Sequence, residues 1–184
     1  MEFSSRTGQL LIASRRLLDP NFVRTVVLIV QQDESGVIGL ILNRPLDVTV
    51  AEACDPAAEE ALGVREKLYQ GGPCPGPLMV LHADAVIGGT QIMQGVHFTA
   101  EREQIGCLMR GEHAGPVRYY AGYSGWSPKQ LEDEIEEGAW LLCPASAELV
   151  FADAPASQWS ALTTRLTVGK WVDVDRMPED PSNN

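Results

Sequence analysis

The chain has 184 residues, 45% of them hydrophobic, and its 14 basic and 25 acidic residues give a net charge of −11. This size suffices for one domain with one core, and no run approaches the roughly 20 apolar residues of a membrane helix. The start of the chain also lacks the apolar region of a secretory signal. We therefore expect a soluble cytoplasmic protein. Because the negative charge repels phosphate backbones and anionic lipid, we also expect it to bind neither nucleic acid directly nor membranes.

A β-hairpin is the clearest local feature of the first third of the chain. An apolar run at 10–13 is suited to a buried strand, and Asp19-Pro20-Asn21 favours a turn. Residues 25–30 and 37–42 are rich in β-forming side chains, and turn-forming residues join them at 33–36. Both runs are apolar at successive positions, so we expect a strand pair that is covered on both faces.

Loop and helix signals dominate the next segment. Pro45 has no N–H for a central ladder, so residues 43–45 are expected to end the strand and begin a loop. Thr49 and Glu52 fit a capping box, and a second helix is expected at 57–62. The glycine- and proline-rich residues 71–77 predict a rigid loop, followed by a strand at 78–81 that ends at His82.

The second half mixes helices and strands. Thr99 is expected to cap a helix that runs through residue 110, and Ser127 to cap a helix that ends at Gly138. A last helix carries the apolar stripe of residues 159–166. Strands are expected at 118–123, 140–143 and 148–151.

The order of these elements lacks the regular alternation of a doubly wound fold, and neither a repeat nor a linker divides them. The sequence therefore predicts an α+β fold with a single domain at 1–172. Residues 173–184 are acidic, contain proline and offer little to bury, so we expect a disordered tail.

The segment Gly122-Tyr123-Ser124-Gly125-Trp126 invites comparison with the G-x-S-x-G nucleophile elbow of hydrolases. Trp126 stands where the second glycine belongs. In the elbow enzymes the histidine base follows the serine, whereas all three histidines of this chain precede Ser124. We expect a structural turn or a ligand-contacting loop here, with a Ser124 nucleophile as the alternative.

Other possible sites lack a necessary part. Prolines remove backbone donors from the loop 71–77, and no nucleotide-binding motif occurs. His82 and Asp84 have no third ligand at a recognisable spacing, and the carboxylates at 133–137 are expected on a solvated helix face. No close pair of the kind used in zinc or redox centres occurs among Cys54, Cys74, Cys107 and Cys143. We therefore expect reduced thiols and no cofactor, metal or catalytic set.

Several stretches resemble one bacterial family, in the family's order. They are 9–13, 19–27, 39–45, 71–73, 122–132, 138–141 and Trp159. Over about residues 8–170 the chain is similar to the AlgH/YqgE family, which implies a mixed, partly barrel-like β-sheet flanked by helices and supplies no established catalytic residue. Arg15-Arg16 and Gln32 depart from the pattern, where relatives commonly have proline and histidine respectively.

We expect a non-enzymatic binding or regulatory protein whose partner is a small ligand or another protein. Arg44 offers a fork for an anion, and Tyr123 and Trp126 offer apolar platforms. A role as a transcriptional regulator rests on family association alone. The alternatives are a hydrolase and a direct DNA-binding regulator, although basic residues are dispersed and no helix-turn-helix is visible. The candidate ligand-binding residues are Asn43, Arg44, Gly71, Gly72, Pro73, Tyr123, Ser124, Gly125 and Trp126.

Overall fold

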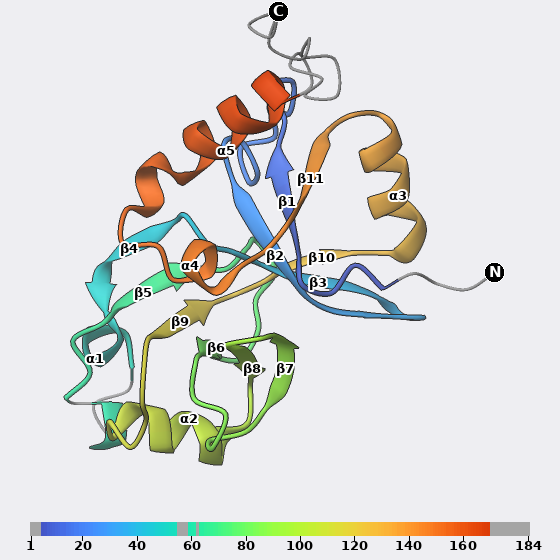
Figure 1. The fold of residues 1–184 in the computed structure, drawn as a ribbon. Helices are drawn as coiled ribbons and strands as arrows, with labels where there is room; N and C mark the ends of the chain where they lie inside the picture. The colour runs from blue at the N-terminus through green and yellow to red at the C-terminus, as the bar shows by residue number, and fades with distance from the viewer. Residues whose placement is uncertain (1–4, 55–58, 62, 170–184) are drawn as a thin grey trace, which may run out of the picture.

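The computed structural model describes residues 5–54, 59–61 and 63–169, whose strands form two sheets and no closed barrel (Figure 1). Sheet A is antiparallel and has the order β10-β3-β2-β1-β11. Its strands are β1 (Gln9–Ala13), β2 (Val26–Asp33), β3 (Gly36–Ile41), β10 (Ser124–Trp126) and β11 (Trp140–Pro144). The predicted hairpin is therefore confirmed as β2–β3.

Sheet B has the order β4-β5-β9-β6-β8-β7, in which β5 and β9 are parallel and the other pairs antiparallel. Its strands are β4 (Pro45–Thr49), β5 (Lys67–Gln70), β6 (Met79–His82), β7 (Thr90–Met93), β8 (Val96–Thr99) and β9 (Val117–Ala121). The helices are α1 (Val50–Ala53), α2 (Arg102–Met109), α3 (Pro128–Glu136), α4 (Ala147–Val150) and α5 (Pro155–Gly169), with a 3-10 turn at Glu59–Ala61. The α+β class is confirmed.

The main core lies between the facing sides of the two sheets. Leu28 of sheet A packs in one cluster with Leu81 and Tyr120 of sheet B, and all three side chains are fully buried. Val150 of α4 and Leu162 of α5 join the same cluster. In Figure 1, α5 runs across the ends of β1 and β2, where it covers this core from the side.

The outer faces of the sheets are also covered. Val27 of β2 packs with Trp126 and with Leu131 of α3 in a second cluster on sheet A. A third cluster joins Val80 of sheet B to Leu108 of α2. Alternate side chains of β2 thus enter different cores, which explains why its sequence is apolar at successive positions and confirms that the hairpin is covered on both faces.

Local capping signals are also confirmed. The Thr49 side chain and Glu52 form the predicted capping box of α1, and the Ser127 hydroxyl accepts from the Gln130 N–H at the start of α3. Gly138 follows α3 with a φ of 77°, a conformation that glycine adopts without strain. The helix start at 55–58 and the tail at 173–184 lie outside the described residues.

Three predicted elements differ from the structure. Residues 147–150 form α4, not a strand, because the Ser146 hydroxyl accepts from the Leu149 N–H and caps a helical turn. Pro45 begins the edge strand β4 instead of a loop, since the first residue of an edge strand needs no N–H for the ladder. Helix α2 begins at Arg102, after Glu101, because the Thr99 hydroxyl accepts from the Glu101 N–H before the helix begins.

Candidate functional site

The candidate ligand-binding residues fall in three segments, 43–45, 71–73 and 122–126. These segments meet in the structure, although they are far apart in the chain. The Gln70 N–H donates to the Arg44 carbonyl at 2.9 Å, and the Ile41 N–H donates to the Gly71 carbonyl at 2.9 Å. The Ser124 hydroxyl reaches the same Gly71 carbonyl at 3.1 Å. This junction links the ends of β3, β5 and β9 with β10, and therefore holds sheet A and sheet B together.

Gly72 is required by the close approach of two backbones at this junction. A Cβ at Gly72 would lie 2.2 Å from the Tyr123 carbonyl carbon and 2.3 Å from the Ser124 nitrogen. Next to it, Cys74 and Tyr123 exchange two backbone hydrogen bonds of 2.9 and 3.0 Å. The predicted Gly71-Gly72-Pro73 loop therefore acts here as a packing element.

Asn43 and Arg44 use their side chains to hold the loop before β2. The Asn43 side chain accepts from the Val26 N–H and donates to the Arg24 carbonyl, both at 2.9 Å. The Arg44 guanidinium donates to the Asn21 carbonyl at 2.6 Å. Its second terminal nitrogen lies 3.3 Å from the Pro20 and Val23 carbonyls, so Arg44 holds this loop, and an anion site at Arg44 stays a prediction.

Trp126 is a core residue instead of an exposed platform. Its side chain is buried, its ring stacks on Phe22 at a centroid distance of 5.5 Å, and it meets Trp140 edge-on. Its Nε1–H donates to Glu134 at 3.0 Å, and the Trp140 Nε1–H donates to the same carboxylate oxygen at 2.8 Å. Glu134 thus satisfies two buried indoles, a role hidden in the sequence by its position among the acidic residues of α3.

Ser124 lacks the surroundings of a nucleophile. It is fully buried in β10, so the expected turn between a strand and a helix is a short edge strand, and its hydroxyl donates to a carbonyl instead of to a base. His82 and His97 lie on β6 and β8 of the other sheet. Among the described residues, no histidine or carboxylate side chain forms a hydrogen bond with the Ser124 hydroxyl.

We expect no labelling of Ser124 by a fluorophosphonate probe, and a loss of about 1 kcal/mol or less in the free energy of unfolding for Ser124→Ala. The Gly71 carbonyl keeps its bond from the Ile41 N–H when the hydroxyl is removed, so no buried acceptor is orphaned. Probe labelling with mass spectrometry and urea denaturation test both statements. Stoichiometric labelling of the native protein would contradict them.

His82 is buried beside His97 and not paired with Asp84. The two imidazole rings stack with centroids 5.5 Å apart, and the Asp84 carboxylate instead accepts from the Val86 and Ala114 N–H groups. Neither ring nitrogen of His82 makes a hydrogen bond of ordinary geometry, although backbone groups of Asp84 lie near the ring. In the described ranges, no three histidine, cysteine or carboxylate side chains gather closely enough to hold a metal ion.

Acidification is expected to destabilise the protein through His82. Burial lowers the pKa of His82, and charge on His97 lowers it further. The unfolded chain therefore binds the proton more readily, so the stabilisation present above about pH 6.5 is lost as the pH falls, by at most about 1.4 kcal/mol per pH unit. Denaturation of wild type and His82→Leu from pH 7.5 to 5.5 should show a shallower dependence for the variant; equal slopes would contradict this.

Tyr123, Gly125 and Trp126 do line a surface hollow, which lies beside the β2–β3 hairpin and has a volume of about 360 Å³. Cys74 and Asp33 line the same hollow. Hydrogen bonds from the Ser35 hydroxyl, then from Gln31 and the Ser35 N–H, hold the pKa of Asp33 at about 2. The hollow therefore carries a fixed negative charge near an aromatic side chain.

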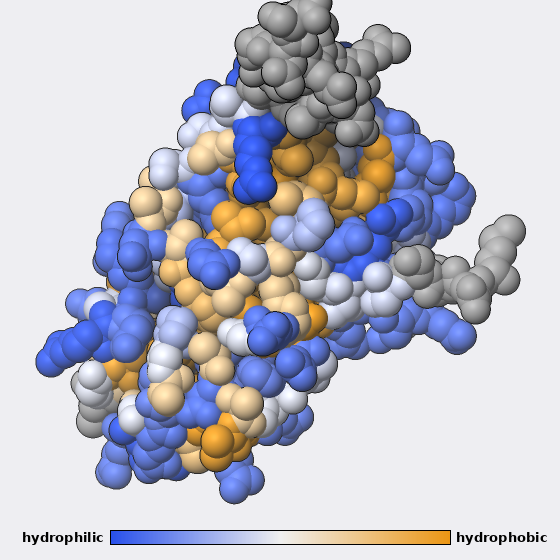
Figure 2. Space-filling model, in the orientation of Figure 1, coloured by the Kyte–Doolittle hydropathy of each residue, from blue (hydrophilic) through white to orange (hydrophobic). Residues whose placement is uncertain are grey.

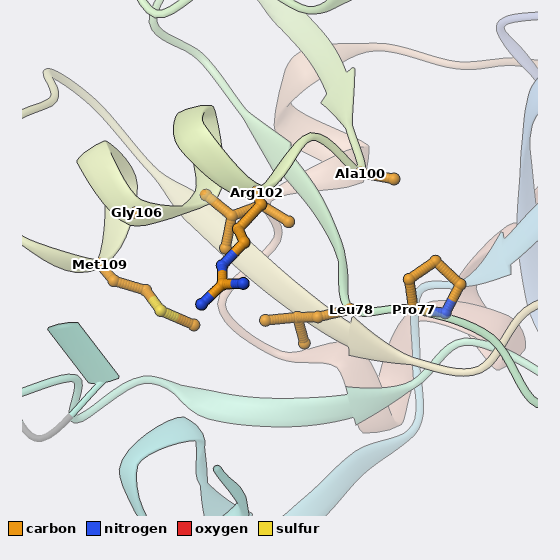
Figure 3. Close-up of a pocket in the computed structure, with 7 residues that line it drawn as sticks. Pro77, Leu78, Ala100, Arg102, Gly106 and Met109 are labelled. Carbon is orange, nitrogen blue, oxygen red and sulfur yellow. The ribbon is translucent and has the colours of Figure 1, made fainter. Parts of the chain in front are cut away.

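A second hollow, of about 290 Å³, lies against α2 and contains none of the predicted site residues (Figure 3). Figure 3 shows Arg102 and Met109 reaching from α2 toward Leu78. Ile105 and Met109 of its lining lie on the helix that the sequence predicts through residue 110. No sequence pattern joins this helix to Leu78, which lies in a different predicted element.

The chain matches known proteins along nearly its whole length. The AlgH-like family model matches residues 10–171. A UPF0301 protein of Chlorobaculum tepidum is 39% identical over 184 residues, which cover 97% of this chain and 96% of the relative. A UPF0301 protein of Streptomyces coelicolor is 35% identical over 199 residues, which cover 100% and 97% of the two chains.

Two solved structures have the same fold. The solution structure of the AlgH protein from Pseudomonas aeruginosa has a TM-score of 0.69 at 28% identity and covers 98% of this chain and 100% of that chain. The crystal structure of a Corynebacterium diphtheriae protein has a TM-score of 0.72 at 25% identity and covers 90% of each chain. The family match over 10–171 and these relatives confirm the resemblance drawn from the motifs, and the chain belongs to the AlgH-like family.

Proposed function

We propose that the protein is a non-enzymatic binding protein that takes an extended, positively charged peptide segment of a partner at the open edge of β10. The observation that supports this most directly is the combination, in one hollow, of an edge strand, a tyrosine and a fixed carboxylate. Ser124, the residue on which a hydrolytic reaction would depend, is buried and donates to a carbonyl.

The edge of β10 is partly occupied and partly open. β10 is the outermost strand of sheet A, and Cys74 pairs with Tyr123, the residue just before β10. Backbone groups alternate sides along a strand, so Gly125 directs its N–H and C=O toward the same side as Tyr123. Gly125 is exposed there, which leaves the donor and acceptor that strand addition requires.

The side chains around this edge select the charge of the partner. Asp33 is ionised at physiological pH, and its hydrogen bonds to Ser35 and Gln31 lower its pKa further, to about 2. A lysine or arginine in the added segment would pair with this carboxylate, while the Tyr123 ring would pack on an apolar neighbour. The net charge of −11 also steers a basic segment toward the protein and an acidic one away from it.

Regulation and location follow from the same proposal. A transcriptional role would pass through a protein partner, since the acidic chain is a poor binder of DNA phosphates. The cytoplasm is the compartment that fits the four cysteines, none of which is disulfide-bonded. Among the described residues no helix has both the length and the apolar character needed to cross a membrane.

The test is a titration of the full chain with a capped hexapeptide of alternating valine and lysine, followed by backbone NMR. We expect the Gly125 amide signal to move, and Asp33→Asn to weaken binding about two- to fivefold, as expected for an exposed ion pair. Asp47→Asn is the matched control, because that exposed carboxylate lies on β4 of sheet B. No movement at millimolar peptide, or equal weakening by both variants, would refute the proposal.

A further inference from the structure

A groove between residues 14–24 and α5 combines apolar and positively charged side chains away from the β10 edge. We call it the arginine groove, and its volume is about 400 Å³. Ser160 and Thr164 form its wall on α5. Its other principal lining residues are Arg15, Leu17, Leu18, Val23, Arg24 and Trp159.

Exposed apolar side chains gather in this groove. Leu18 is 77% exposed and Val23 is 37% exposed, and they are two of the four large hydrophobic residues exposed in the described part of the chain. Single exposed apolar side chains are common in soluble proteins, but two of them in one groove beside a tryptophan are typical of an interaction surface.

The arginines of the groove are positioned without acidic partners. Arg24 has a φ of 56°, the one positive value found for a non-glycine residue in the described ranges, and its guanidinium lies 5.7 Å from the centre of the Trp159 ring. Within residues 5–54, 59–61 and 63–169, neither Arg15 nor Arg24 forms a salt bridge. A neighbouring hollow on α5, which shares Ser160 and Thr164, adds Arg165. An acidic, partly apolar segment is the complementary ligand.

In place of the free tail expected from composition alone, we propose that the C-terminal segment of the same chain, residues 170–184, docks in the arginine groove. Its residues 172–175 read Val-Asp-Val-Asp, followed by Met177, Glu179 and Asp180. The four acidic side chains outnumber the two basic ones, Lys170 and Arg176, so the segment is acidic and partly apolar, and the groove is basic and partly apolar. The valines would cover Leu18 and Val23, and the carboxylates would pair with Arg15 and Arg24.

The path of the chain permits this docking. Helix α5 carries Thr164 of the groove and ends at Gly169, five residues later, which is about 7.5 Å along the helix axis. Ten extended residues span about 33 Å, so the segment can turn back along α5 and reach Leu18.

Charge favours the chain's own segment over an acidic partner. A separate acidic protein would be repelled by the net charge of −11. A segment of the same chain is tethered near the groove, so its effective concentration there is in the millimolar range despite this repulsion. The groove thus has an occupant that is always present, and any outside ligand must displace it.

The experiment compares methyl NMR signals of Leu18 and Val23 in the full chain and in a full-length variant carrying Asp173→Asn, Asp175→Asn, Glu179→Gln and Asp180→Asn. We expect these signals to move in the variant, and 0.5 M NaCl to move them the same way in the wild type. A control with equal charge change carries Asp47→Asn, Glu101→Gln, Glu103→Gln and Asp153→Asn at exposed residues that do not line the groove.

A synthetic peptide of residues 170–184 supplies the second readout. It should bind the variant with the neutralised C-terminus, and adding Arg15→Gln and Arg24→Gln should weaken that binding at least tenfold. Unchanged Leu18 and Val23 signals, or equal movement in the control variant, would overturn the proposal. Either result leaves the strand-addition proposal intact, because that concerns a basic peptide and the edge of β10.

Discussion

Trp126→Ala is expected to lower the free energy of unfolding by about 3 to 5 kcal/mol. The indole is 4% exposed and lies between Phe22 and Trp140, so alanine would leave a cavity in the core beneath α3. The indole N–H of Trp126 also donates to Glu134. In the variant, Glu134 would lose this bond and keep the one from the Trp140 indole. Urea denaturation followed by far-ultraviolet circular dichroism measures the loss.

Trp126→Phe is the control for the hydrogen bond. Phenylalanine retains an aromatic ring against Phe22 but has no N–H for Glu134, so it should lose about 1 kcal/mol for that bond and somewhat more for the smaller ring. A loss below 1 kcal/mol for Trp126→Ala would show that the indole is not packed as described.

Gly72→Ala is expected to cost about 3 kcal/mol or more, at the upper end of overpacking effects. The added Cβ would lie 2.2 Å from the Tyr123 carbonyl carbon, and backbone atoms cannot rotate away as a side chain can. The two sheets would have to separate at the junction between β5 and β10. Thermal and urea denaturation of the purified variant give the measurement.

Gly63→Ala is the matched control, since no atom lies within 4 Å of the position its Cβ would take and its φ is not positive. That substitution should be neutral or stabilise by up to about 1 kcal/mol, because alanine restricts the unfolded chain. Similar losses at Gly72 and Gly63 would contradict the packing argument.

Elements with local signals could be predicted from the sequence, and elements that depend on distant pairing could not. Ser127 and Thr49 mark helix starts because each cap bonds within three residues. The strands β7 and β8 have four residues each and no distinctive pattern, so their pairing with β6 could not be predicted. Residues 148–151 are apolar and short, a pattern that fits a strand or a helical turn equally well.

The same distinction applies to the candidate site. Residues 43–45, 71–73 and 122–126 lie next to predicted strand ends, where a fold can bring loops together, and hydrogen bonds join them in the structure. It could not show that Arg44 bonds to carbonyls about twenty residues earlier, or that Glu134 binds two indoles. Those roles depend on which way a side chain points after the sheets have assembled.

The strand order of sheet A has a consequence for how the chain folds during synthesis. β1 pairs with β11, and β3 pairs with β10, so this sheet joins residues 9–13 to 140–144. Until β10, α3 and β11 have been made, the outer face of β2, including Val27, lacks the partners that cover it in the finished protein. Such long-range pairing slows folding and exposes apolar strands in the meantime. The nascent chain is therefore expected to require a holding chaperone until about residue 144 has emerged from the ribosome.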